Sequence, residues 1–253
     1  MDPRVKDRIR RAPVLFHAAK TAQALLVALR RVGWRASRRG TIARYLAATP
    51  PGGRGLTLGA GHHPPAGWLA SDLDPRMAPG VVHLDATARF PFADATFDRI
   101  HSEHMIEHVP LAGGRVMLAE CRRVLRPGGR LRLATPDLAR LAGLVAHPVL
   151  PPEGEAYVRW IAATFVEAPL EPRPVDVLNH AMRAWGHVFL YDEATLRDEL
   201  VRAGFGAVTR HPLNESADPA LRGLETHART VGGEPHVAWE TMVLEAVREE
   251  TGR

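Results

Sequence analysis

Glycines and acids stand at the ends of four apolar runs in the first half of the chain, where they could bind a nucleoside. The first run ends in Gly59-Ala60-Gly61, the second on Asp72, the third on Asp85-Ala86 and the fourth just before Ser102-Glu103. Such runs predict strands, and the carboxyl ends of parallel strands line one crevice. Glycines there let a ligand approach the backbone, and carboxylates accept hydrogen bonds from ribose hydroxyls or an adenine amino group. The pattern predicts a nucleoside site.

The same stretch disfavours a nicotinamide dinucleotide. The dinucleotide fingerprint has a third glycine three positions after Gly61, and Pro64 occupies that position here. Pro64 and Pro65 also leave no room for the long helix whose N-terminus would hold a phosphate. We therefore expect a ligand that needs no phosphate contacts.

Seven runs in all predict strands, and the helical patterns between them predict an α/β fold with a mostly parallel sheet and helices on both faces. The expected strands begin at Leu56, Trp68, Val81, Phe97, Arg130, Ala207 and Thr241. Asp137 and Asp192 are placed to cap helices, and Arg126–Gly129 predicts a tight turn. The segment 211–238 is expected to be a long polar loop.

The first part of the chain is basic and amphipathic. Residues 1–54 hold 13 of the 33 lysines and arginines against two acids. Pro50-Pro51-Gly52-Gly53 marks a boundary, so we predict a basic helical arm over 1–52 and one domain over 53–253. A proline-rich stretch at about 146–178, with one helix over 153–166, is expected to be an insertion that shapes the pocket. The arm is a candidate for contact with a membrane surface or another protein.

Composition sets the broad class. The 253 residues are 45% hydrophobic and 24% charged, as in an ordinary globular protein. Cys121 is the only cysteine, so a disulfide framework and a cysteine metal site are excluded and a reducing, cytoplasmic location is expected. We expect Cys121 to be a small core residue.

The ordered motifs resemble those of class I S-adenosylmethionine-dependent methyltransferases. The resemblance covers roughly residues 55–250 and is closest to a bacterial branch with a shortened first glycine loop. The motifs that carry it are the glycine turn Gly59-Ala60-Gly61 and the segments Asp72–Pro75, Asp85–Thr87, Phe90–Asp98, Ser102–Val109, Val124–Gly129 and Trp185–Asp192. The resemblance implies a Rossmann-like, seven-stranded fold and S-adenosylmethionine as the cofactor.

The resemblance also implies roles for single residues. Gly59, Ala60 and Gly61 would lie under the methionine part of the cofactor, and Asp72 would hold the ribose diol. Asp85 and Ala86 would contact the adenine. Ser102 and Glu103 would face the sulfonium and the incoming acceptor.

An oxygen acceptor of high pKa needs a base, and histidine titrates nearest to neutral pH. The candidate catalytic residues are His187, His104 and His108, with Glu103 as an orienting or basic carboxylate. We expect the acceptor to be a sugar hydroxyl of a glycan, or another small-molecule hydroxyl. Trp160, Trp185 and Trp239 could stack on it.

Alternative functions follow from particular features. His104-Met105-Ile106-Glu107-His108 matches the H-x-x-E-H pattern of zinc hydrolases, but no third ligand is identifiable, and we expect no metal. Thr57 stands where the family often has an acid, which together with the short loop motivates a binding protein without catalytic activity. The basic arm motivates a nucleic-acid methyltransferase, although a nucleic-acid partner is not expected. The oligomeric state is left open.

Overall fold

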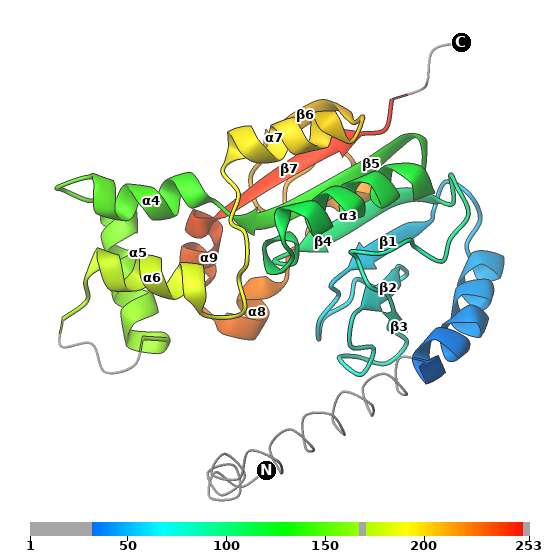
Figure 1. The fold of residues 1–253 in the computed structure, drawn as a ribbon, viewed down its shortest axis with the longest axis horizontal. Coiled ribbons are helices and arrows are strands. Elements are labelled where there is room, and N and C mark those ends of the chain that lie inside the picture. Colours follow the sequence, from blue (N-terminus) through cyan, green and yellow to red (C-terminus); the bar gives the residue numbers. More distant parts are fainter. Residues whose placement is uncertain (1–31, 167–170, 250–253) are drawn as a thin grey trace, which may run out of the picture.

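A seven-stranded sheet forms the centre of the computed structural model, which describes residues 32–166 and 171–249 (Figure 1). Its strands lie in the order β3-β2-β1-β4-β5-β7-β6. The strands are β1 (Gly55–Leu58), β2 (Leu69–Asp72), β3 (Val82–His83), β4 (Phe97–Glu103), β5 (Leu125–Pro136), β6 (Gly206–His211) and β7 (Thr241–Val247). Only β7 pairs antiparallel, with β5 on one side and β6 on the other. The predicted seven-stranded, mostly parallel sheet is confirmed.

Helices surround the sheet and extend beyond one of its ends. They are a helix over 32–48, η1 (Ile106–His108), α3 (Leu111–Val124), α4 (Leu138–Ala146), α5 (Pro152–Thr164), α6 (Pro174–Arg183), α7 (Glu193–Arg202), η2 (Pro219–Leu221), α8 (His227–Val231) and α9 (Glu234–Glu240). In Figure 1, α3 and α7 lie over the sheet, whereas α4, α5 and α6 form a separate group to the left. No helix among the described residues is long and apolar enough to cross a membrane.

The main core lies between the sheet and the helices α3 and α7. Apolar residues of α3 recur every three or four positions, so one stripe of the helix faces the strands. Cys121 belongs to that stripe and is fully buried, as expected. Gly114 is required there because a Cβ would lie 2.6 Å from the Tyr191 hydroxyl.

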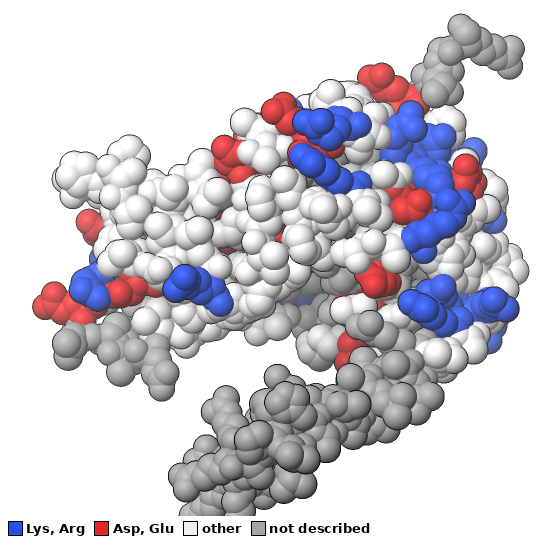
Figure 2. Space-filling view, viewed as in Figure 1, with Lys and Arg blue, Asp and Glu red and all other residues white. Residues whose placement is uncertain are grey.

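A second core holds the helical group together. It is formed by Leu141 and Leu144 of α4, Tyr157 and Ile161 of α5, and further residues of α6. The proline-rich stretch therefore carries two helices, α5 and α6, where one was predicted. The surface over α4 is largely uncharged in Figure 2, whereas arginines gather over the half with α3 and α7.

The predicted turn at 126–129 and the predicted loop at 211–238 both differ from the structure. Arg126–Gly129 belongs to β5, where the register against β4 shifts between the pairs Phe97–Leu125 and Arg99–Arg130. Gly128 takes a φ of +76° there, so the glycine pair bends the strand instead of starting it. The segment 211–238 is not a plain loop, since it carries η2, α8 and most of α9. The two predicted caps are confirmed: Asp137 accepts from Ala139 N and Asp192 from Thr195 N.

The helix over 32–48 packs beside the sheet. Its Tyr45 hydroxyl donates to Gly55 O at 2.9 Å and accepts from Gly55 N at 2.8 Å. Arg38 donates to His83 O at the end of β3. The rest of the predicted basic arm, residues 1–31, lies outside the described residues, and the division of the chain at residue 52 stays a prediction.

Candidate active site

The glycine turn after β1 begins the predicted crevice. Leu58 pairs with Ser71 of β2 and with Ser102 of β4, so the carboxyl ends of these three strands lie level. Gly59 and Gly61 have φ values of +63° and +53°, a region that side chains disfavour. A Cβ on Gly59 would lie 2.5 Å from Met105 Cγ, whereas a Cβ on Gly61 would meet nothing within 4 Å. Gly59 is needed for packing, and Gly61 leaves open space.

Asp72 joins this turn to the end of β2. Its Oδ2 accepts from Gly61 N at 3.1 Å and its Oδ1 from Asp74 N at 2.9 Å. A carboxylate has about four acceptor positions, so both oxygens can accept a further hydrogen bond. The backbone carbonyl of Asp72 accepts from Leu84 N at 2.9 Å. Because Leu84 directly precedes Asp85, this bond places the acid that follows β3 at the same edge of the sheet. Asp85 Oδ1 holds the following turn through the amide and hydroxyl of Thr87.

The predicted cofactor residues therefore converge at one edge of the sheet. Gly59, Ala60, Gly61, Asp72, Asp85 and Ala86 all follow or end strands β1 to β3, and Ser102 lies near the end of β4. Ser102 is 1% exposed, and its hydroxyl has no hydrogen-bond partner among the described residues. Open space at Gly61 and spare acceptor positions on Asp72 suit a nucleoside with free ribose hydroxyls, so the arrangement fits the nucleoside part of S-adenosylmethionine.

An aromatic pocket of about 460 Å³ adjoins the crevice. His62 and Met77, from the segments after β1 and β2, line one side, and Trp160, Phe165 and Trp185 line another. Apolar side chains from α4 and α5 and the end of α8 complete the wall. Trp239, the third predicted stacking residue, instead packs on Tyr157 in the second core at 4.8 Å between ring centroids.

His104 lies at this pocket with both ring nitrogens engaged. Its Nε2 lies 3.1 Å from Thr241 Oγ1 and its Nδ1 3.3 Å from Glu107 Oε1. The ring stacks on His227 at 3.9 Å. Burial opposes protonation of His104, but nearby carboxylates, Glu107 foremost, outweigh it and raise the pKa of the imidazole. Burial, together with the charge of His104, lowers the pKa of His227 to about 3.

His108 and His187 meet on the other side of the same pocket. Their rings are edge to face, 5.0 Å apart. His187 Nδ1 lies 2.5 Å from Ala181 O and donates to it as the neutral tautomer, which leaves Nε2 as an acceptor. Burial lowers the pKa of His187 and favours that neutral form.

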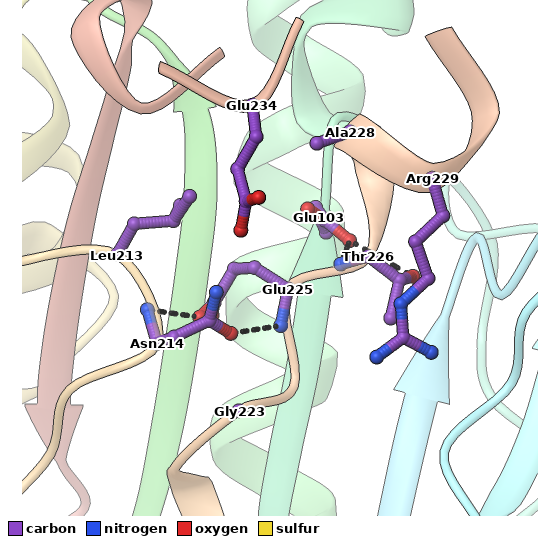
Figure 3. A pocket seen from close by; sticks show the side chains of 9 residues that line it. All are labelled: Glu103, Leu213, Asn214, Gly223, Glu225, Thr226, Ala228, Arg229 and Glu234. Atoms are coloured by element: carbon purple, nitrogen blue, oxygen red, sulfur yellow. Dashed lines mark hydrogen bonds between the residues drawn. The ribbon is translucent and has the colours of Figure 1, made fainter. Parts of the chain in front are cut away.

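Glu103 is turned away from this pair. Its carboxylate accepts from Thr226 N at 2.7 Å and from His227 N at 2.9 Å at the start of α8. Figure 3 shows it reaching this segment beside a polar cavity of about 280 Å³ that Glu225 and Glu234 also line. In this structure Glu103 thus positions α8, and its predicted catalytic role stays a prediction.

Two titratable residues of the pocket could not be predicted from the sequence. His227 begins α8 and Glu240 ends α9, two segments without a motif. Both residues line the pocket only because α8 and α9 pack beside it. Their sequence neighbours carry no pattern that would have identified them.

Comparison with known proteins agrees with this geometry. Residues 57–133 match the family model of the methyltransferase domain. No curated protein matches the chain.

Several solved structures resemble the chain. In the complex between the Haloferax volcanii Trm112 methyltransferase activator and a methyltransferase, one chain matches with a TM-score of 0.48 and 16% identity, covering 89% of this chain and 96% of that one. A methyltransferase from Thermotoga maritima matches with a TM-score of 0.47 and 17% identity over 81% and 87%. One from Archaeoglobus fulgidus matches at 0.44 and 15% over 86% and 94%.

The stretch that matches the methyltransferase domain includes the glycine turn and the strand-end acids Asp72 and Asp85. Together with the seven-stranded sheet, this match supports the predicted resemblance to the class I S-adenosylmethionine-dependent methyltransferases. The methyltransferase-domain match likewise supports the predicted cofactor, S-adenosylmethionine.

Proposed function

We propose that the protein transfers the methyl group of S-adenosylmethionine to a hydroxyl of a small molecule bound in the aromatic pocket. The observation that carries this proposal is the position of the pocket. It lies between the segments that follow β1 and β2 and the helical group, with His104 and His108 of the β4 end in its wall. A molecule held there is next to the predicted place of the methionine moiety.

The cofactor supplies an activated methyl group on a sulfonium, and the residues of the chain hold and orient it. Asp72 accepts from the ribose hydroxyls with the acceptor positions that Gly61 N and Asp74 N leave free. Asp85 and Ala86 contact the adenine, and Gly59–Gly61 lies under the methionine moiety. Methyl transfer depends largely on such positioning and on the exclusion of water.

The wall of the pocket narrows the class of acceptor. Trp160, Phe165 and Trp185 offer aromatic surface, and Leu141 and Ile161 add apolar area. Such a wall favours an acceptor with an apolar or aromatic body that carries a hydroxyl. A sugar hydroxyl on a glycosylated compound fits the same description if the sugar stacks on one of the tryptophans.

The hydroxyl would be activated on the His108–His187 side of the pocket. Nothing among the described residues bonds to His187 Nε2 or to the ring nitrogens of His108, so both can reach a ligand. His104 and Glu103, the other predicted catalytic residues, already use their polar atoms within the protein. They would support the geometry of the pocket.

Transfer of a labelled methyl group tests the proposal. The protein is incubated with methyl-labelled S-adenosylmethionine and hydroxylated aromatic compounds, glycosides or a cell extract, and labelled products are identified by mass spectrometry. We expect an O-methylated product whose formation falls in Trp185→Ala and persists in Trp34→Ala, a tryptophan outside the pocket. Label on nitrogen or carbon would refute the acceptor class. Cofactor binding without transfer to any compound would favour the binding-protein alternative.

A further inference from the structure

Three side chains beside the aromatic pocket form a cluster that suits a metal ion. Glu107, His108 and His187 each bring one ligand atom within 4.8 Å of the others. The first two belong to η1, directly after β4. His187 belongs to the segment after α6, and the amides of Val188 and Phe189 bond to the Glu107 carbonyl at 2.8 and 3.1 Å. The backbone therefore fixes the two parts of the cluster against each other.

Glu107 contributes a buried carboxylate whose two oxygens each have one polar neighbour. The residue is 0% exposed. Its Oε2 accepts from Thr135 Oγ1 at 3.0 Å. Its Oε1 lies 3.3 Å from His104 Nδ1 and pairs with that imidazole. A carboxylate has about four acceptor positions, so these two contacts leave room for a bound cation.

His187 is oriented as a metal-ligating histidine usually is. His187 donates its Nδ1 proton to a backbone carbonyl, the typical contact that orients a ligating imidazole and leaves Nε2 for the ion. The rings of His108 and His187 are inclined at 72°, so their in-plane lone pairs can converge on one point. His108 is exposed, which gives an ion access from solvent.

A neighbouring cluster of His104, His227 and Glu240 also satisfies the distance condition, but its geometry is unsuitable. The two imidazoles are stacked with 15° between their planes, and the in-plane lone pairs of stacked rings do not meet. Both nitrogens of His104 are engaged, and Glu240 accepts a hydrogen bond from Tyr157.

We infer that Glu107, His108 and His187 bind one divalent transition-metal ion, with Zn²⁺ the best fit. Two imidazoles and one carboxylate are a common ligand set for zinc sites that keep a position open. The open position would face the aromatic pocket, which both histidines line. The site differs from the H-x-x-E-H pattern of the sequence, because His104 belongs to the other cluster and His187 takes its place. It also departs from our expectation of no metal.

A metal ion here would bind the acceptor hydroxyl and lower its pKa. This role rests on the proposed function, whereas the existence of the site does not. The chain would then activate the hydroxyl through the ion, and His108 and His187 would serve as its ligands.

Metal binding to protein purified without a polyhistidine tag tests the inference. We expect about one Zn²⁺ per chain by elemental analysis, and a visible absorption band of four- or five-coordinate Co²⁺ after exchange. Affinity, measured by competition with a chromogenic chelator, should fall at least roughly 10-fold in His108→Gln and His187→Gln. His62→Gln, in the same pocket, and His227→Gln, in the rejected cluster, should bind as the wild type does.

Glu107→Gln should lose affinity as well, with circular dichroism to confirm folding because this residue is buried. Binding far below one equivalent, or binding that His187→Gln leaves unchanged, would overturn the site. An equal loss in His227→Gln would also overturn it, since the other cluster would then be the ligand set. The labelled-methyl transfer assay on the same samples separates the two proposals: Zn²⁺ bound without any methyl transfer would refute the proposed function alone.

Discussion

Asp72 provides the sharpest test of the cofactor site. Its carboxylate is tied to Gly61 N and Asp74 N, so its position is fixed before any ligand arrives. In Asp72→Ala the ribose hydroxyls lose a charged acceptor. A hydrogen bond to a charged group contributes about 1.5–3 kcal/mol. Loss of one such bond therefore predicts a roughly 10- to 150-fold higher Kd for S-adenosylmethionine.

Titration calorimetry with S-adenosylmethionine and S-adenosylhomocysteine measures this change. Asp72→Asn keeps one acceptor oxygen, so its Kd should lie between those of the wild type and Asp72→Ala. Asp74→Ala is the matched control, because Asp74 is a neighbouring acid whose carboxylate pairs with Arg76 at the surface. An Asp72→Ala variant that is folded and binds within about twofold of wild type would refute the assigned role. So would an equal loss in Asp74→Ala.

Other predictions concern the buried ion network, the glycine turn and the pocket. Arg132 is fully buried between Glu225 and Glu245. Its replacement by Met should lower the free energy of unfolding by about 3–5 kcal/mol, because two buried carboxylates lose their partner. A loss under about 1 kcal/mol in urea denaturation would contradict this. Burial opposes ionisation of Glu225, but His101 and Arg132 lower its pKa from 4.5 to about 2. The stability that Glu225 contributes is therefore present above about pH 4.5 and lost as the pH falls toward 2. Between these pH values the urea midpoint should depend less on pH in Glu225→Gln than in the wild type. Gly59→Ala should lose more stability than Gly67→Ala. Both glycines have a positive φ, a conformation that costs a residue with a side chain about 1–2 kcal/mol. Only at Gly59 would the added Cβ also clash with a neighbouring side chain, that of Met105. Trp185→Ala should raise the acceptor KM roughly 2- to 12-fold, from about 0.5–1.5 kcal/mol of stacking, and leave cofactor affinity unchanged; a matching loss of cofactor affinity would count against the pocket assignment.

The strands, the caps and the acidic edge could be predicted because their signals are local. An apolar run fixes a strand, and a parallel strand must deliver the residue that follows it to the carboxyl edge. Asp72 therefore contacts the glycine turn, and Asp85 follows β3 at the same edge of the sheet. Asp137 and Asp192 cap α4 and α7 for an equally local reason: each precedes a helix whose first amides lack partners.

The second helix of the insertion and the helices within 211–238 had weaker signals. α8 has five residues and α9 seven, and helices this short gain their stability from tertiary contacts. The bend at Gly128 has a similar origin, because the shift of register between β4 and β5 depends on the partner strand.

The sequence alone therefore determined the class of fold, the acidic edge of the sheet and the set of candidate histidines. Only the tertiary structure decided which of these histidines act together. It joined His187 to Glu107 and His108 through backbone bonds between distant segments, and it paired His104 with His227 instead. It also turned Glu103 toward α8. The position of a strand end follows from the chain's own pattern, whereas the convergence of side chains depends on how separate segments pack.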